Sequence, residues 1–220
     1  MTDLEYSRPA GGGTPTEGSA PGTRITSVKT AFKEWAVICR ALGTGRQVLI
    51  LRKGGIGEDA GTFRPKHREF LLFPTGFHQS TEQVLTEAHR LLRQAEAHQP
   101  RADQVTLSHY SVVADAIRVP SVAALRALRG EHIWSDTVVE ERFHRWQEDA
   151  VYALIVRVYA LPNPVTIPMM DHYAGCKSWV DLEADVSTAG AVPVLADKAF
   201  GDRRAAIQKV LCTLTDEWEE

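Results

Sequence analysis

The chain has 220 residues, of which 44% are hydrophobic and 24% are charged, and its formal net charge is -3. A chain of this length is expected to form one domain that buries roughly 70% of the surface of its unfolded state. The composition excludes a fully disordered, collagen-like or fibrous protein. The net charge excludes a wholly basic nucleic-acid coat protein, although it allows a local basic face.

The cysteines and the hydropathy pattern bear on the compartment. Cys39, Cys176 and Cys212 are too few and too scattered for a disulfide framework or a zinc site. No apolar run approaches the ~20 residues of a membrane span, and the N-terminus lacks the order of a signal peptide. We therefore expect a cytoplasmic protein with reduced thiols, no membrane contact, no bound metal and no cofactor.

The composition changes along the chain and suggests three segments. Residues 1–26 are rich in Gly, Pro, Ser and Thr, which predicts a disordered N-terminal tail. Residues 27–214 are predicted to form a single globular domain. Residues 215–220 form an acidic C-terminal end.

The first half of the predicted domain contains two helical and two strand patterns. Apolar residues at three- and four-residue intervals predict a helix over 27–43, capped by Ser27 and ended by Gly43. The segment QVLILR, residues 47–52, is typical of a buried strand, and residues 70–73 are predicted to be its partner. A helix capped by Ser80 is predicted over 80–96.

The second half predicts five further elements and, with them, the fold class. These are one or two strands over 105–119, short helices over 122–128 and after Trp134, a strand over 152–161 stopped by the prolines at 162 and 164, and a helix over 197–214. Strands and helices interleave without a strict βαβ rhythm. This favours an α+β fold, with a partly closed mixed β-sheet or small β-barrel and helices packed outside it.

A local excess of positive charge marks residues 40–68. This span has seven basic residues against two acidic ones, Glu58 and Asp59, and the basic ones are Arg40, Arg46, Arg52, Lys53, Arg64, Lys66 and Arg68. Part of the span is a polar, glycine-containing loop after the strand over 47–52, and loops of that length are often functional. Guanidinium and ammonium groups bind phosphate oxygens well, so the pattern suggests an anion-binding loop. Solvated surface charge is the alternative.

Two short segments next to the predicted strands could belong to the same site. Gly54 and Gly55 would let backbone N–H groups approach an anion, or simply form a turn, because the Walker and GxGxxG spacings are absent. Thr75, His78 and Gln79 offer hydroxyl, imidazole and amide groups after the second strand, where they could read a base or another planar ligand. The alternative is a turn that caps the next helix.

The sequence also contains a few candidate catalytic residues. Glu58 and His67, with Glu69 close by, could serve as acid and base or as metal ligands, but a histidine in a polar loop is more often solvated. Cys176 is favoured as a structural cysteine over a nucleophile. The tryptophans are spread along the chain, as is typical of residues in or near the core.

The sequence resembles the bacterial family catalogued as domain of unknown function 1802. The resemblance is carried by AFKEWAVICRALGTGRQVLILRKGGI, FLLFPTGFHQ, HIW, RF, YALIVRVYALPNP and GCKSWVDL. It covers nearly everything from Lys29 to Phe200. Members of that family are sometimes associated with a restriction-endonuclease-like domain, so the resemblance implies a link to restriction-modification or other DNA or RNA processing.

A more distant resemblance connects the chain with the ASCH proteins of the PUA-like superfamily. It rests on Lys33 and Trp35, then the segment over 45–47, then a strand ending in Arg52. It implies a small β-barrel that binds RNA or modified nucleic acid, with Lys33, Arg52 and Lys53 lining a cleft beside Thr75, His78 and Gln79. Where enzymatic ASCH relatives carry lysine and threonine after the glycine, this chain has Gln47 and Val48, so amidohydrolase activity is not implied.

Three functional hypotheses follow. The first is a module that binds a nucleic acid or nucleotide, with Arg52, Lys53 and Arg64 on phosphates and Thr75, His78 and Gln79 reading the base. The second is a hydrolase that acts on a nucleotide-like or phosphorylated substrate, with Glu58 or His67 as acid or base. The third is an interaction module whose basic loop binds an acidic protein partner.

Overall fold

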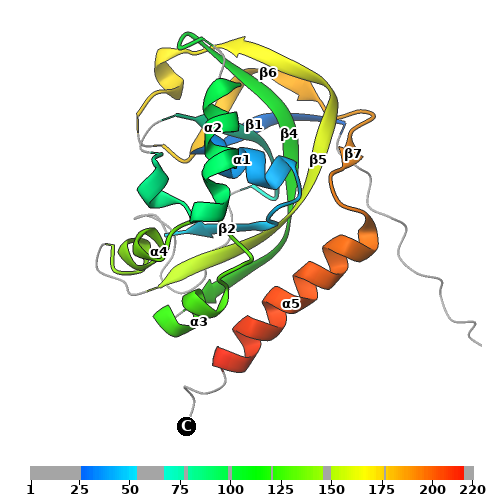
Figure 1. Ribbon diagram of the computed structural model, residues 1–220. Coiled ribbons are helices and arrows are strands. Elements are labelled where there is room, and N and C mark those ends of the chain that lie inside the picture. The colour runs from blue at the N-terminus through cyan, green and yellow to red at the C-terminus, as the bar shows by residue number, and fades with distance from the viewer. Residues whose placement is uncertain are drawn as a thin grey trace, which may run out of the picture.

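The computed structural model describes residues 26–53, 67–76, 79–98, 101–119, 121–145, 150–175 and 177–215. Within these ranges a mixed seven-stranded sheet has helices packed around it, and the path of paired strands is β2-β5-β4-β3-β1-β6, with β7 paired to β5 (Figure 1). The strands are β1 (Ser27–Trp35), β2 (Leu49–Arg52), β3 (Glu69–Thr75), β4 (Gln104–Val119), β5 (Val151–Pro168), β6 (Trp179–Ser187) and β7 (Val192–Pro193). The α+β class, with a mixed sheet and packed helices, is confirmed.

The described helices are short, apart from the last one. They are α1 (Ala36–Gly43), α2 (His89–Ala97), α3 (Val122–Ala127), α4 (Asp136–Phe143) and α5 (Asp197–Thr215), with single 3₁₀ turns at Thr81–Gln83, Thr86–Ala88 and Asp171–Tyr173. The predicted helices at α3, α4 and α5 are confirmed. Ser121 caps α3 by accepting a hydrogen bond from the backbone N–H of Ala124 at 3.1 Å.

The prediction of one helix over 27–43 is wrong in its first half. Residues 27–35 form β1, which pairs parallel with β3 and antiparallel with β6. The strand passes into α1 without a loop between them. The apolar residues of both elements therefore form one run whose spacing imitates a single helix. Pairing on both sides outweighs that local pattern.

The strand over 69–75 exists, but its predicted partner is wrong. β3 pairs with β1 and β4, whereas β2 pairs antiparallel with β5. A segment of nearly continuous apolar residues fits a strand that is buried on both faces, and β3 is such a strand. Its Phe70 and Leu72 lie in one hydrophobic core, while Leu71 and Phe73 lie in a second one.

The predicted end of the strand at the prolines is also wrong. β5 continues through Pro162 and Pro164 to Pro168. The register with β4 shifts at this point, because Ala160 faces His109 while Val165 faces Leu107. The irregularity leaves the proline segment outside the regular ladder, where a missing N–H costs no hydrogen bond.

The predicted helix over 80–96 begins late. Two 3₁₀ turns precede α2, and Val84 between them forms a bridge with Trp134. Ser80 bonds the Glu82 carboxylate at 2.5 Å rather than a backbone N–H, so it is not a helix cap. The bridge between Val84 and Trp134 holds the α3–α4 connection against the segment before α2.

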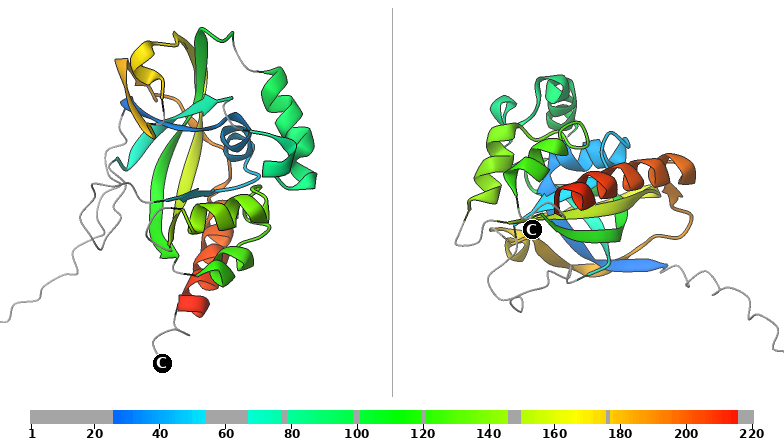
Figure 2. Two further views of the ribbon diagram at one scale, coloured as in Figure 1. Left: turned by 90° about the vertical axis from the view of Figure 1, so that its left-hand side faces the viewer. Right: turned by 90° about the horizontal axis from the view of Figure 1, so that it is seen from below.

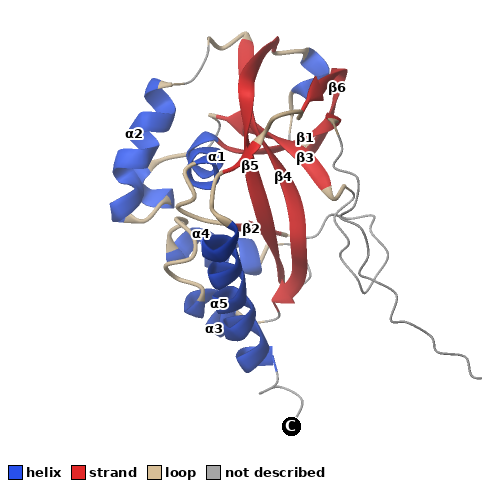
Figure 3. Cartoon of the chain, turned by 90° about the vertical axis from the view of Figure 1, so that its right-hand side faces the viewer, coloured by secondary structure: helices blue, strands red, loops and turns tan. Residues whose placement is uncertain are grey.

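Helices and strands divide the molecule into two layers. Figure 3 shows the helices gathered on one side of the long β4–β5 pair, with β1, β3 and β6 on the other. Seen from below in Figure 2, α5 crosses over β5 and β4, and its residues Phe200, Ile207 and Leu211 are buried in the larger core. The smaller core is enclosed by β1, β3, β4 and β6 and contains Tyr110 and Tyr173.

The two end strands of the path are brought together by side chains. Among the described strands, β2 is paired only to β5 and β6 only to β1, yet Arg52 at the end of β2 hydrogen-bonds Ser178 just before β6. The sheet therefore curls until its edges approach each other. The residues that join these edges form the candidate site.

Candidate functional site

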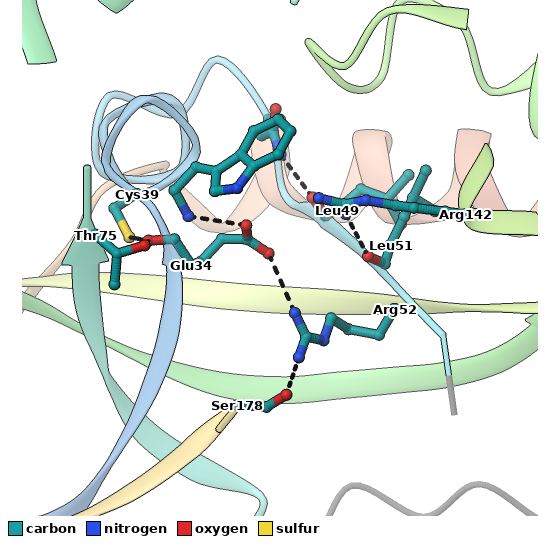
Figure 4. Close-up of polar contacts among 10 residues, drawn as sticks. Glu34, Cys39, Leu49, Leu51, Arg52, Thr75, Arg142 and Ser178 are labelled. Atoms are coloured by element: carbon teal, nitrogen blue, oxygen red, sulfur yellow. Dashed lines mark hydrogen bonds and ion pairs between the residues drawn. The ribbon is translucent and has the colours of Figure 1, made fainter. Parts of the chain in front are cut away.

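The ends of β1, β2 and β3 lie together at one end of the curled sheet. Trp35 at the end of β1 faces Thr75 at the end of β3 in parallel register. Arg52 ends β2, and Figure 4 shows its side chain between Glu34 of β1 and Ser178. Strand ends are common places for binding sites, because the polar side chains there are held by rigid elements.

Glu34 is a deeply buried carboxylate, with a side chain that is only 2% exposed. Its Oε1 accepts the backbone N–H of Trp35 at 2.8 Å, at the start of α1. A carboxylate at a helix N-terminus is favoured by the helix dipole. Its Oε2 is buried, and no described residue forms a hydrogen bond with it.

Arg52 is the cation nearest to this carboxylate in the part of the chain that the structure describes. Its Nη1 lies 4.0 Å from Glu34 Oε2, which makes an ion pair but not a hydrogen bond. Its Nη2 donates to Ser178 Oγ, and its guanidinium lies 4.7 Å from the centre of the Phe32 ring. Burial lowers the pKa of the Arg52 guanidinium, and the charge of Glu34 partly offsets this shift. An arginine stays protonated at neutral pH all the same.

Arg142 of α4 adds a second guanidinium. It donates to the carbonyl of Leu51 at 2.9 Å, next to Arg52. Its guanidinium lies 5.1 Å from the Trp35 ring and 4.8 Å from the Trp134 ring. Burial lowers its pKa, Glu34 raises it, and the positive charge of Arg52 lowers it further. The positive charges of the two arginines therefore repel each other, while the Glu34 carboxylate attracts both. We call Glu34, Arg52, Arg142 and Ser178 the arginine cluster.

Aromatic rings lie beside the cluster. Trp179 at the start of β6 meets Phe32 and Phe70 edge-on, with ring centres 4.7 and 5.2 Å apart. His67 lies against Trp179 at 5.2 Å. Trp179 and His67 are both partly exposed, so they could offer a surface on which a planar ligand stacks.

The structure places five of the predicted binding residues near these strand ends. Lys53 follows Arg52 and donates to the carbonyl of Phe143 at 2.7 Å. Thr75 Oγ1 donates to the Glu34 carbonyl at 3.2 Å, and Gln79 Oε1 accepts the N–H of Val37 in the first turn of α1 at 3.2 Å. Lys33 points away from the cluster and donates to the carbonyls of Tyr173 and Gly175 at 2.6 and 2.7 Å. Alternation along β1 puts Lys33 and Glu34 on opposite faces.

Other predicted features lie outside the described residues. Glu58, Arg64 and His78 are among them, and so are Cys176 and the glycine pair at 54 and 55. An acid or base role for His67 stays a prediction. Burial raises the pKa of the nearby Glu69, at the start of β3.

Glu34, Arg142 and Ser178 were not among the site residues predicted from the sequence. Glu34 was hidden because a charged residue every few positions suits the solvent side of a helix, and residues 27–43 were predicted to be one helix. Reading SVKTAFKEW as a strand would have placed Glu34 on the same face as Phe32, two residues before it. Arg142 belongs to a short helix whose position only the tertiary fold reveals.

The described residues also bear on metal binding and on membrane spans. Within the described ranges, no three His, Cys, Asp or Glu side chains gather in a way that could hold a metal ion. No helix in those ranges is both long and apolar enough to cross a membrane.

Comparison with known proteins gives a family for this chain. A family model described as domain of unknown function 1802 matches residues 31–206, and the chain belongs to this family. The matched range includes every residue of the arginine cluster. A search of curated protein sequences finds no match.

Solved structures of ASCH from Zymomonas mobilis are similar to this chain. A crystal structure of a point mutant of that protein, in which one tyrosine is replaced by phenylalanine, has 11% identity and a TM-score of 0.39, covering 80% of this chain and 96% of that one. A crystal structure of ASCH itself has 9% identity and a TM-score of 0.37, covering 80% and 93%. TM-scores this low transfer no site residue between the proteins.

Proposed function

We propose that this protein is a binding module for nucleic acid or nucleotides, and that the arginine cluster with Lys53 forms its phosphate-binding site. The observation that carries the proposal is the charge of the cluster. Among the described residues, two partly buried guanidiniums lie near a single carboxylate, which leaves a net positive charge in a place where water screens it poorly. A phosphate oxygen would offset that charge, and guanidinium forks match phosphate geometry.

The rings beside the cluster support a ligand that has both an anionic and a planar part. Trp179 and His67 are partly exposed next to the buried Phe32. Stacking of a base on an aromatic side chain contributes about 1–3 kcal/mol. In this proposal, Arg52, Arg142 and Lys53 hold phosphate while the rings support the base.

Thr75 and Gln79 have a supporting role in this proposal. Their hydrogen bonds hold the Glu34 backbone and the first turn of α1 in place. Their role as base readers stays a prediction, as do the roles of His78 and of Arg64 on phosphate.

The test is to titrate fluorescent single- and double-stranded DNA and RNA with wild-type protein at two salt concentrations. The test variant is Arg52→Ala with Lys53→Ala. The matched control is Arg101→Ala with Lys198→Ala, which also removes two positive charges, from side chains that are 83% and 86% exposed. Thermal unfolding of both variants checks that they are folded.

We expect wild-type binding to weaken as salt rises, because bound phosphates release counterions. The test variant should lose at least about tenfold in affinity, and its salt slope should fall by about one for each phosphate contact that is lost, while the control stays near wild type. Equal loss in both variants would point to unspecific attraction. Binding of polyglutamate without any binding of nucleic acid would favour an acidic protein partner instead.

A further inference from the structure

Within the arginine cluster, one hydrogen-bond acceptor has no donor among the described residues. Glu34 Oε2 is buried and accepts no hydrogen bond from a described residue. Leaving a buried charged acceptor without a hydrogen bond is energetically costly, because its hydration is lost without replacement. The Glu34 side chain is nevertheless fixed in this position, because its other oxygen accepts the N–H of Trp35 and its backbone belongs to β1.

The position of Arg52 keeps it from forming a hydrogen bond with this oxygen. Arginine and a carboxylate usually meet through two short parallel hydrogen bonds. Here the guanidinium lies over the Phe32 ring and bonds Ser178, so that Nη1 stays 4.0 Å from Oε2. The pair is electrostatic only, and a donor from elsewhere could reach Oε2 without breaking a hydrogen bond between Glu34 and Arg52.

The charges around Oε2 indicate which donor suits it. A carboxylate only accepts hydrogen bonds, so the partner must bring an N–H or O–H group. Arg52 and Arg142 already provide two positive charges for this single carboxylate. A third cation, such as the amine of a lysine, would be repelled by them. A neutral donor, such as a neutral amino group, is therefore favoured.

The proposed ligand is a nucleic acid or nucleotide. In such ligands, neutral amino groups are found on the base edges of adenine, cytosine and guanine. Uracil and thymine have none. Their ring N–H stands between two carbonyl oxygens, which would face the carboxylate. A base stacked beside Trp179 would bring its edge towards the strand that carries Phe32 and Glu34.

We propose that Glu34 selects the base, by accepting a hydrogen bond from the exocyclic amino group of adenine, cytosine or guanine through Oε2. This inference rests on the proposed function and deepens it. Arg52, with a side chain 24% exposed against 2% for Glu34, lies on the more accessible side of the pair. A ligand phosphate that binds Arg52 would draw the guanidinium from Ser178 and open the way to Oε2.

The test removes the amino group from the ligand and the charge from the protein. The ligands are a single-stranded oligoadenylate RNA, the same RNA with purine riboside, which lacks the amino group, and a control with 7-deazaadenosine, which keeps it. The proteins are wild type and Glu34→Gln, whose side chain has nearly the same shape. Binding is measured by fluorescence anisotropy, and thermal unfolding checks the fold of the variant.

A hydrogen bond to a charged group contributes enough for roughly a tenfold or larger change in affinity. We expect purine riboside to weaken wild-type binding by about tenfold, and 7-deazaadenosine to change it by less than about twofold. In Glu34→Gln the difference between adenosine and purine riboside should shrink to within about threefold, because the acceptor is no longer charged.

The outcomes separate this inference from the proposed function. If wild-type protein binds both RNAs equally, Glu34 does not read the amino group, although the protein still binds nucleic acid. The same loss in wild type and Glu34→Gln would place the reading residue elsewhere. If no RNA or DNA binds at all, the proposed function itself fails. The comparison of ligands on wild-type protein holds even if the variant does not fold.

Discussion

Arginines on two sides of the molecule have very different partners. On the α5 side, Arg204 meets Asp115 of β4 through two hydrogen bonds of 2.6 and 2.8 Å, and Gln208 adds a third at 3.0 Å. At the strand ends, Arg52 and Arg142 share Glu34 without a hydrogen bond between Arg52 and the carboxylate. The hydrogen bonds of Asp115 raise the pKa of Arg204, whereas burial lowers the pKa of both cluster arginines.

The difference separates a structural ion pair from a candidate binding site. The Arg204 pair is balanced in charge and in hydrogen bonds, and it fastens α5 to the sheet beside α3 (Figure 1). The arginine cluster is balanced in neither respect. A count of basic residues would treat the two places alike, and only the partners of each charge distinguish them.

The largest expected effect on stability comes from removing the shared carboxylate. Glu34→Ala removes the carboxylate that the described residues place near two partly buried guanidiniums, and breaking such a buried arrangement costs about 4 kcal/mol. Asp115→Ala removes a carboxylate whose partner Arg204 is 42% exposed, so water compensates and the loss is about 1 kcal/mol. Urea unfolding of both variants measures the difference. Equal losses would break the distinction between the two regions.

The second expected effect is a pH dependence of stability that comes from His132, whose ring lies beside that of Trp134. His132 is buried, and its ring centre lies 5.7 Å from that of Trp134, which contacts Arg142. Burial lowers the pKa of His132 to about 4, from an ordinary 6.5. The charge of Asp136 raises it, and those of Arg142 and Arg129 lower it.

Because the folded pKa lies below the unfolded one, the unfolded state binds the proton first as pH falls. The stability of the wild-type protein should be complete above the ordinary pKa, and the His132 contribution should fall as pH drops from 6.5 towards 4. The loss is about 3 kcal/mol over that window. His132→Gln should remove this part of the pH dependence and keep the part due to carboxylates. Urea unfolding at several pH values tests this, and equal slopes in both proteins would contradict it.

Much of the fold could be predicted from the sequence where local pattern and tertiary structure agree. The strands at β2 and β4 and the helices at α3 and α5 combine a clear period with a clear start or end signal. The strand partner of β3 and the start of α2 were wrong because pairing and helix onset depend on distant residues, and two further errors come from β1 and β5. In β1 a strand and a helix share one apolar run, and in β5 a strand passes two prolines through an irregularity that no local signal announces.

The candidate site was predictable only in part, for a related reason. Arg52 and Lys53 stood out because they belong to a visible run of basic residues. Glu34, Arg142 and Ser178 reach Arg52 from distant parts of the chain, and Ser178 does so because the sheet curls until β2 and β6 approach. Charge patterns along the sequence show where cations are, but the balance of a cluster depends on which distant residues fold against it.

The smallest expected effect tests the Arg204 pair by itself. Arg204→Lys keeps the charge but replaces a planar fork with a single ammonium group, which cannot make both hydrogen bonds to Asp115 in the same geometry. Because Arg204 is partly exposed, the free energy of unfolding should fall by only about 0.5 kcal/mol. The affinity for nucleic acid should not change, because α5 contributes no residue to the arginine cluster. Urea unfolding and the binding titration, run on the same variant, measure both quantities. A loss of binding without a loss of stability would mean that the α5 side takes part in recognition, and the separation between the two regions would then have to be given up.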